Sequence, residues 1–318
     1  MPRVSVIIPT YNRAEFLCSA ITSVLNQTFQ DFEIIVVDDA SNDGTYEVVS
    51  SFNGNGIKYI RHKINRGGAA ARNTGIRAST GEYIAFLDDD DEWMPEKLQM
   101  QVDLLQISPP EVGAVYTGFV IVSRAGGEIL YQGVPTRKGY IFNEMLIGNL
   151  VGATPSVFLR RECFNRVGLF DENLPFAEDW DMWIRISKEF HFECIEEILV
   201  KCYFHNRDKL SVNLEGLSRG IEIMLEKYGH FPGFKKTLSY SYLRLGVLSC
   251  YNRNTRKGRE AFFKAIRLYP FEIKHYFNLF ISLLGADNFR KLKMCKEKVI
   301  GPFRDNKSSM DYERRMYF

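Results

Sequence analysis

The segment Tyr83-Ile84-Ala85-Phe86-Leu87-Asp88-Asp89-Asp90-Asp91 joins a short apolar run to four consecutive carboxylates. The apolar half predicts a strand buried on both faces, because such strands are near-continuous apolar runs. A second run of this kind, 32–37, also ends in acidic residues, Asp38 and Asp39. Parallel sheets bind their ligands beyond the carboxyl ends of the strands. Both acidic clusters are therefore predicted to lie at the ligand-binding edge of one sheet.

Strand and helix patterns alternate around these two runs over the first 108 residues. The alternation predicts an α/β fold in which helices flank a central, mostly parallel sheet. Strands are expected at 4–8, 32–37, 57–61 and 83–87, and helices at 16–25, 45–52, 67–78 and 95–107. Residues 112–201 carry a more mixed pattern.

Strand signals fade after Glu215. Helices are expected at 217–228, 235–251, 256–268 and 273–284, and the last two resemble one helical hairpin of the tetratricopeptide type. The sequence thus predicts an α/β domain over 1–215 and an all-helical C-terminal extension over 216–318.

The overall composition is that of an average globular protein, with 45% apolar and 25% charged residues among 318. These fractions exclude a disordered chain, a collagen-like fibre and a disulfide-stapled miniprotein. The net charge of +2 is unevenly placed. Residues 1–200 hold 17 Lys and Arg against 28 Asp and Glu, whereas 201–318 hold 24 against 11. Such asymmetry predicts two parts with different partners.

Basic residues gather near the end of the chain, at Arg290, Lys291, Lys293, Lys296 and Lys298. A run of this kind predicts peripheral contact with an anionic membrane surface. A solvated helix face, or a contact between copies in a homo-oligomer, explains the run equally well. Nucleic acid is not an expected partner, because no nucleic-acid-binding module accompanies the charge.

The cysteine pattern and the hydropathy indicate a compartment. Six scattered cysteines without a C-x-x-C pair are typical of free thiols in a reducing cytosol. The apolar run 4–9 is too short for a signal peptide. The best membrane-span candidate, 276–284, is about half of the roughly 20 residues that cross a bilayer and is interpreted as a buried helix segment. We expect a cytoplasmic protein, in solution or at the inner face of the membrane.

The run Asp88–Asp91 predicts a site for a divalent cation. Adjacent carboxylates repel one another, and a hard cation with oxygen ligands relieves that repulsion. Mg²⁺ or Mn²⁺ takes one or two carboxylates and completes its shell with water and phosphate oxygens. The alternative is a solvated acidic loop that caps the following helix.

Asp38 and Asp39 predict a contact to a nucleoside, through a base N–H or ribose hydroxyls. An Asx turn at residues 41–44 is the alternative, and one aspartate can serve each role. The chain has neither G-x-G-x-x-G after its first strand nor a G-x-x-x-x-G-K-[ST] loop, which argues against nicotinamide, flavin and P-loop sites. Gly67 and Arg72, in the segment that opens an alanine-rich helix, are candidates for contact with a nucleotide or phosphate.

The segment 178–183 (EDWDMW) places three carboxylates among two tryptophans. A carboxylate beside aromatic surface can act as a general base. An ordinary helix N-terminus, where acids complement the dipole, explains the segment equally well. His205 follows a predicted strand at 198–204 and is a candidate for metal or diphosphate contact, with a plain surface histidine as the alternative.

Taken together, these motifs resemble those of family 2 glycosyltransferases, which have the GT-A fold. The resemblance covers about residues 3–212. It rests on Val4–Arg13 (VSVIIPTYNR), Val36–Thr45 (VVDDASNDGT), Asn73-Thr74-Gly75, Phe86–Asp91 (FLDDDD), and Glu178-Asp179 followed by Trp183 and His205. It implies an inverting, metal-dependent transfer of sugar from a nucleoside-diphosphate sugar, with a UDP-sugar expected, to a glycan or lipid-linked acceptor in polysaccharide biosynthesis.

The resemblance also implies roles for the matching residues. Asp179 matches the catalytic base. Asp88 and Asp90 match the Asp-x-Asp positions, with Asp90 as the direct ligand of Mn²⁺ or Mg²⁺. Glu178, Trp183 and His205 match the acceptor and diphosphate pocket, and His205 is a further candidate metal ligand. The candidate donor-binding set is Pro9, Thr10, Tyr11, Arg13, Asp39, Gly67, Arg72, Asp88 and Asp89, in which Asp39 matches the base contact and Asp89 stands where the family often has a small polar residue.

Two other functions remain open on the residues alone. A sugar-phosphate nucleotidyltransferase also uses a metal and a parallel sheet, but the segment 10–13 lacks the glycines that a triphosphate loop needs. A non-catalytic nucleotide-sugar-binding or scaffold protein fits the helical extension, which resembles interaction repeats.

Overall fold

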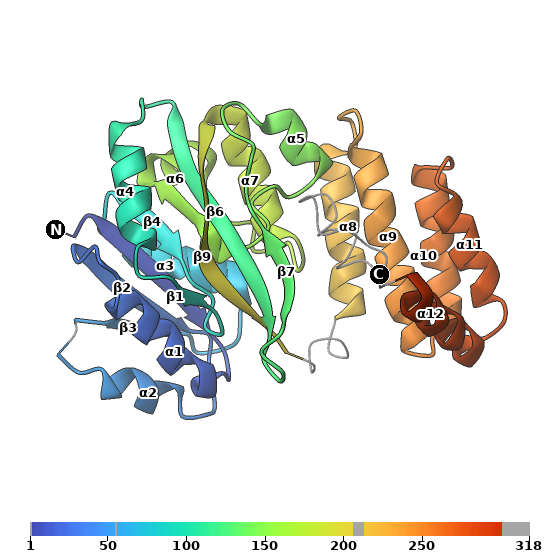
Figure 1. Cartoon of the computed structure of the whole chain (residues 1–318), viewed down its shortest axis with the longest axis horizontal. Helices are drawn as coiled ribbons and strands as arrows, with labels where there is room; N and C mark the ends of the chain where they lie inside the picture. Colours follow the sequence, from blue (N-terminus) through green and yellow to red (C-terminus); the bar gives the residue numbers. More distant parts are fainter. Residues whose placement is uncertain (1, 55, 206–212, 301–318) are drawn as a thin grey trace. The chain divides into compact units, whose positions relative to one another are not determined.

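The computed structural model describes residues 2–54, 56–205 and 213–300, with side chains as far as residue 293. The chain falls into two compact units (Figure 1). The first contains 1–145, 149–173 and 177–206. The second contains 146–148, 174–176 and the described part of 207–318.

The first unit is built on one sheet whose described strands run in the order β3-β2-β1-β4-β8-β6-β9-β5, with β7 paired to β6. The strands are β1 (Val4–Thr10), β2 (Phe32–Asp38), β3 (Lys58–Arg61), β4 (Tyr83–Phe86), β5 (Glu92–Trp93), β6 (Val112–Ser123), β7 (Ile129–Gly133), β8 (Val157–Arg160) and β9 (His191–Phe204). The first four are mutually parallel, as the alternating pattern predicts. Beyond them the sheet is mixed, because β8 is antiparallel to both β4 and β6 while β9 is parallel to β6.

Helices flank this sheet, and glycine and alanine determine how closely one of them approaches it. The helices are α1 (Ala14–Leu25), α2 (Thr45–Ser51), α3 (Gly68–Ala78), α4 (Lys97–Ile107), α5 (Phe142–Ile147), α6 (Arg161–Val167) and α7 (Glu178–Glu189), with a 3₁₀ turn η1 (Thr154–Ser156). Helix α3 packs on β1 and β2. A Cβ added at Gly75 would lie 2.3 Å from Ile7, so this position of the alanine-rich helix requires a glycine.

The register of the parallel strands brings the predicted site residues to one edge. Thr10 at the end of β1 pairs with Asp38 at the end of β2, and Asp38 pairs with Arg61 at the end of β3. Phe86, the last residue of β4, pairs with Ile7. The segments that follow β1, β2 and β4 therefore leave the sheet at the same edge, where such sheets bind ligands.

The second unit is helical, with α8 (Leu214–Tyr228), α9 (Phe234–Tyr251), α10 (Thr255–Leu268), α11 (Ile273–Ser282) and α12 (Ala286–Ile300). The first four confirm the helices expected from the sequence, and α12 carries the basic run. Buried residues of α9 to α12, such as Leu243, Phe262, Ile281 and Phe289, form its core. No helix among the described residues is both long and apolar enough to cross a bilayer.

Candidate active site

Both carboxylate oxygens of Asp38 contact neighbouring groups of the protein. Its Oδ1 accepts the backbone N–H of Ser41 (2.8 Å), and its Oδ2 accepts the hydroxyl of Tyr59 (2.5 Å) and lies 3.6 Å from Nε of Arg61. The carboxylate of Asp38 thus accepts the N–H three residues on and stabilises the start of the turn after β2. Within that turn, Asp43 makes the Asx contact, because its Oδ1 accepts the backbone N–H of Thr45 (3.2 Å).

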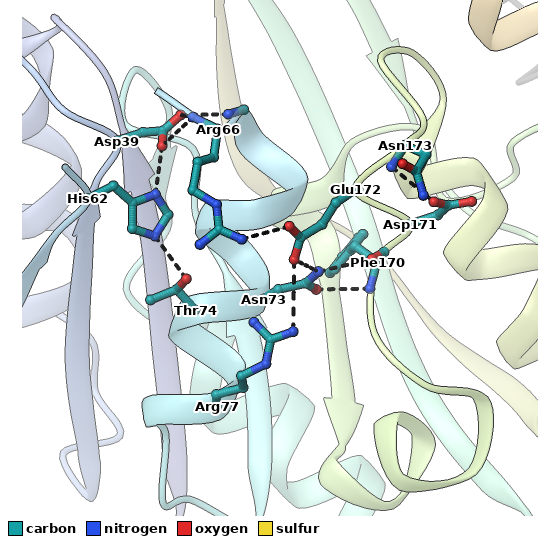
Figure 2. A network of polar contacts seen from close by, with 11 residues as sticks. Asp39, His62, Arg66, Asn73, Thr74, Arg77, Phe170, Asp171, Glu172 and Asn173 are labelled. Atoms are coloured by element: carbon teal, nitrogen blue, oxygen red, sulfur yellow. Dashed lines mark hydrogen bonds and ion pairs between the residues drawn. The ribbon is translucent and has the colours of Figure 1, made fainter. Parts of the chain in front are cut away.

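Asp39 is also buried, and three protein groups meet its carboxylate (Figure 2). Its oxygens accept the backbone N–H groups of Arg66 (2.9 Å) and Gly67 (2.7 Å) and lie 2.7 Å from Nδ1 of His62. The other ring nitrogen of His62 contacts the Thr74 hydroxyl at 2.9 Å. The N–H of Gly67, a candidate phosphate donor, is thus directed at Asp39, which fixes the loop before α3.

The carboxylates of Asp89, Asp90 and Asp91, which follow β4, meet fewer protein donors than that of Asp39. Arg13 lies 3.3 Å from Asp89 and 2.7 Å from Asp90, and Asp91 accepts the backbone N–H of Tyr203 (3.0 Å). Burial raises the pKa of Asp89 to about 7. Burial also raises the pKa values of Asp90 and Asp91, and the neighbouring carboxylates add to the effect. One guanidinium does not offset this much buried negative charge.

His205 follows β9 and lies beside the same cluster. Its Nε2 is 3.3 Å from Oδ2 of Asp90 but lacks the geometry of a hydrogen bond. The ring packs against Phe16, with centroids 4.6 Å apart. A buried imidazole nitrogen that has no hydrogen-bond partner among the described residues, and that is directed at a carboxylate, is available to an incoming ligand.

Arg72 joins two motifs that are 90 residues apart in the sequence. Its guanidinium lies 2.7 Å from Asp88, just beyond β4, and 3.1 Å from Glu178, the first residue of α7. Burial opposes the charge of Arg72, but the two carboxylates outweigh it and raise its pKa. The acidic cluster of β4 and the N-terminus of α7 therefore share one buried cation.

Asp179 follows Glu178 and accepts three hydrogen bonds. They come from the backbone N–H of Trp180 (2.7 Å), the side-chain amide of Asn149 (3.3 Å) and the hydroxyl of Thr154 (3.4 Å). Burial, and next the charge of Glu178, raise the pKa of Asp179 to about 6. An aspartate of this kind remains ionised at neutral pH but is more basic than usual, as a proton acceptor requires.

A polar network fixes the loop that leads to α7 (Figure 2). The side chain of Asn73 on α3 exchanges two hydrogen bonds with the backbone of Phe170, both 2.9 Å. Glu172 accepts the Asn73 amide (2.9 Å) and pairs with Arg66 (2.9 Å) and Arg77 (3.8 Å). Because Arg66 also donates its backbone N–H to Asp39, the loop after β2 and the loop before α7 are joined through one residue.

Trp183 is fully buried and packs against Phe170, and its indole N–H has no hydrogen-bond partner among the described residues. Its place in an acceptor pocket stays a prediction. Thr10 is buried, and a hydrogen bond from its side chain opposes the rise in the pKa of Asp89. Tyr11 is exposed, and Pro9 lies in β1 at the same edge.

The described residues contain no group of three or more His, Cys, Asp or Glu side chains arranged to hold a metal ion. Asp88 and Asp90 pair instead with Arg72 and Arg13. The donor types nevertheless fit Mn²⁺ or Mg²⁺, which takes one or two protein carboxylates and fills its shell from water and phosphate. Two observations support this fit, namely the raised pKa of Asp89 after β4 and Nε2 of His205, which has no hydrogen-bond partner among the described residues.

Four of the residues that hold this site were not predicted from the sequence. They are His62, Asn149, Thr154 and Glu172. Each comes from a loop, from a strand end or from the short turn η1, and no local pattern distinguishes it. A histidine directly after the predicted strand 57–61 was the available signal for His62.

Strand-end carboxylates, a carboxylate at the start of α7 and the mixed sheet are features that fit the glycosyltransferase class. The sequence model of glycosyl transferase family 2 matches residues 5–168, and the chain belongs to that family. An uncharacterized glycosyltransferase of Rickettsia typhi (RT0329) is 33% identical over 247 residues, 75% of this chain and 73% of that protein.

The chain covers most of one further relative but only about a third of another. The UDP-Glc:alpha-D-GlcNAc-diphosphoundecaprenol beta-1,3-glucosyltransferase WfgD of Escherichia coli is 32% identical over 194 residues, 60% of this chain and 72% of that protein. An uncharacterized glycosyltransferase of Rickettsia felis is 35% identical over 212 residues, but these are 64% of this chain and 35% of that protein. The chain thus spans about a third of the length of such larger relatives.

Solved structures show the same GT-A-like fold. Residues 1–349 of Staphylococcus aureus TarS superpose with a TM-score of 0.57 at 18% identity, over 93% of this chain and 91% of that one. The mannosyltransferase PcManGT of Pyrobaculum calidifontis, in complex with GDP-Man and Mn²⁺, gives 0.55 at 22% identity, over 84% of this chain and 75% of that one.

Proposed function

We propose that this protein transfers a sugar, with inversion, from a nucleoside-diphosphate sugar to an acceptor hydroxyl. The observation that carries the proposal is Arg72, which bridges Asp88 and Glu178 and so brings the acidic end of β4 beside the carboxylates of α7. A donor diphosphate and an acceptor base must meet in this way, because the reacting groups have to lie within a few ångströms. Family membership supports the same reaction.

A divalent cation, Mn²⁺ or Mg²⁺, is part of the proposal. Asp90 and Asp88 would hold it, with His205 as the third candidate ligand. Bound there, it would neutralise charge on the diphosphate leaving group. The named complex of PcManGT with GDP-Man and Mn²⁺ supports a cation of this kind.

We propose a UDP-sugar as the donor. WfgD is named for UDP-Glc, and TarS has been solved with UDP and with UDP-GlcNAc. Pro9, Thr10, Tyr11, Arg13, Asp39, Gly67, Arg72, Asp88 and Asp89 form the proposed donor site. The Asp39 carboxylate makes four hydrogen-bond contacts with the protein, two at each oxygen, so a base N–H bound there would replace or share one of them.

Asp179 is the proposed general base. It takes the proton of the acceptor hydroxyl, and the hydroxyl oxygen forms a bond to the anomeric carbon from the face opposite the diphosphate. The bond between that carbon and the diphosphate oxygen breaks, the electron pair leaves with the diphosphate, and the configuration inverts in one step. The transition state has the oxocarbenium character of other glycosyl transfers. Asn149 and Thr154 hold the carboxylate for this step.

The acceptor is proposed to be a glycan or a lipid-linked sugar of a surface polysaccharide, because WfgD is named for a diphosphoundecaprenol acceptor. The transferase domain is proposed to comprise residues 1–215 and the helical extension 216–318. A cytoplasmic location, at the inner face of the membrane, follows from such an acceptor.

The test is transfer from a panel of nucleotide sugars with Mn²⁺, comparing the wild type with Asp179→Asn. The variant should lose about a hundredfold or more in kcat, since a positioned general base contributes about 10²–10⁴. Its affinity for the donor should be unchanged. Asp103→Asn, which alters an exposed aspartate on α4, is the matched control.

Full activity of Asp179→Asn would remove this residue as the base. Release of pyrophosphate from a nucleoside triphosphate and a sugar phosphate would replace transferase with nucleotidyltransferase. Absence of transfer from every donor, with donor binding intact, would favour a non-catalytic protein.

A further inference from the structure

Helix α11 in the second unit has its polar residues inside and its apolar residues outside. Its buried side carries His275, Asn278 and Ser282, together with Ile281. The exposed residues are large and apolar instead, including Ile273 at 79% exposure and Phe280 at 65%. A helix on the surface of a globular protein normally shows the opposite arrangement. The segment 276–284 was expected to be buried, and the structure shows that expectation to be wrong for most of its large side chains.

The buried polar side chains fix this orientation. Nε2 of His275 lies 3.0 Å from the hydroxyl of Ser239 on α9, and the Asn278 amide donates to the Lys274 carbonyl at 2.7 Å. Ile281 packs into the core cluster beside Phe262 and Phe289. Rolling α11 to bury its outer side would break the contact between His275 and Ser239 and withdraw Ile281 from the core, whereas the Asn278 bond lies within the helix. The apolar side therefore stays exposed in the isolated unit.

The outer side of α11 forms a continuous surface at helical spacing. We define the α11 face by Phe271, Ile273, Tyr276, Phe277, Phe280, Leu283 and Leu284, all of which are exposed. Phe271, just before the helix, is 87% exposed. Contiguous aromatic and aliphatic surface of this kind marks an interaction site, whereas single exposed apolar residues do not.

The charge around the α11 face identifies the partner. Residues 255–293 contain nine Lys and Arg against three Asp and Glu, and no Asp or Glu occurs from 273 to 286. Lys257 and Lys264 pair with Glu215 and Glu222 of α8, and counting these two carboxylates still leaves an excess of four basic residues. Glu272, at the start of α11, accepts the Tyr240 hydroxyl and the backbone N–H of Lys274. Two copies docked through this face would bring two basic hairpins together, which like-charge repulsion disfavours. An anionic surface complements both the apolar face and its basic surroundings.

We propose that the α11 face docks on an anionic lipid bilayer. The helix lies in the plane of the interface over a length of about 15 Å, at 1.5 Å per residue, with Phe277 and Phe280 inserted among the acyl chains. Tyr276 suits the boundary, because its ring is apolar and its hydroxyl stays hydrated. Exposed basic side chains such as Arg267 and Lys291 meet the lipid phosphates.

This surface differs from the one expected from the basic run near the end of the chain. Lys293 is buried, and the Arg290 guanidinium donates to the Tyr251 carbonyl. Lys296 and Lys298 lie beyond the described side chains. Among the described side chains of that run, only Lys291 is exposed. The principal membrane contact is therefore proposed to be the apolar α11 face and not the basic run.

The experiment is flotation of the full chain with vesicles that contain neither donor nor acceptor, so its outcome is independent of the transferase proposal. Vesicles of phosphatidylcholine with about 30% phosphatidylglycerol should bind the protein, and pure phosphatidylcholine should bind it more weakly. The double variant Phe277→Gln, Phe280→Gln should bind about tenfold or more weakly, because it removes two large apolar side chains from the interface.

Ile107→Gln is the matched control, since Ile107 is 83% exposed at the end of α4 in the first unit. It should bind vesicles like the wild type, and circular dichroism should show both variants folded. Equal binding by the double variant, or no binding by the wild type to anionic vesicles, would overturn the proposal. A concentration-dependent dimer that the double variant abolishes, without vesicle binding, would assign the face to a second copy.

Discussion

Asp39, at the end of β2, meets three protein groups, namely His62 and the backbone N–H groups of Arg66 and Gly67. Asp89, at the end of β4, is equally buried, but burial raises its pKa to about 7 and Arg13 is the cation beside it. Both lie at one edge of the same sheet. The difference separates a carboxylate whose charge is met by hydrogen-bond donors of the protein from one whose charged form is disfavoured by burial, which is the kind of group that the proposed cation would stabilise.

The largest expected effect comes from breaking the cluster after β4. Asp90→Asn should lower transfer about a thousandfold, because it removes a proposed ligand worth several kcal/mol of charge stabilisation. The rise in melting temperature on adding Mn²⁺ should disappear, while the variant without metal stays folded. Thermal shift with and without Mn²⁺ checks this. A variant that keeps its full response to Mn²⁺ would exclude Asp90 as a ligand.

Removing the charge of Asp39, the other aspartate of this comparison, should destabilise the fold. Asp39→Asn keeps the size of the side chain but turns an amide toward three donors, so we expect the free energy of unfolding to fall by about 2–3 kcal/mol. Urea denaturation measures the change. Asp31→Asn, at an exposed aspartate just before β2, is the control and should have little effect. If Asp39→Asn is as stable as the control, the three contacts do not hold the loop.

Asp179 shares a feature with each of these two aspartates. It accepts hydrogen bonds as Asp39 does, and its pKa is raised as that of Asp89 is, here to about 6. Only its ionised form accepts a proton, so kcat/KM should be constant above this pKa and fall about tenfold per pH unit below it. A pH profile of kcat/KM, with protein stability checked at each pH, tests this. Asn149→Ala removes one donor to the carboxylate and should move the falling limb to higher pH. A flat profile across the acidic range would contradict the assignment.

The smallest expected effect tests whether Asp38 is purely structural. Tyr59→Phe removes the hydroxyl that Asp38 accepts and should cost about 1 kcal/mol of unfolding free energy, because Ser41 and Arg61 remain. Donor affinity should not change. A loss of donor affinity without a loss of stability would move Asp38 from the scaffold to the binding site.

The sequence was sufficient where the signal is local. Apolar runs ending in aspartates identify β2 and β4 together with their acidic ends, and the helices from α8 to α11 follow from their periodicity. The partners of these carboxylates are not local, since His62 and Asn149 reach Asp39 and Asp179 through the packing of loops. Trp183 shows that a local pattern can also be ambiguous, because aromatic residues beside acidic ones occur in cores and in binding sites alike.

The burial of residues 276–284 was predicted wrongly for a related reason. Periodicity identifies the apolar side of a helix but does not say what covers it. In this unit the hydrogen bond between His275 and Ser239 helps determine which side faces inward. Such a contact depends on two helices meeting, and neither sequence segment contains it.

Among the described residues, Asn12, Ala40, Ala177 and Arg253 have positive φ without being glycine, and the first three lie beside the ends of β1 and β2 and the start of α7. Left-handed backbone is tolerated by glycine, asparagine and aspartate and costs other residues about 1 kcal/mol or more. Ala40 and Ala177 therefore tolerate few replacements, and β-branched residues there should be strongly selected against. Libraries made to change the acceptor should keep both alanines and vary the neighbouring loop residues.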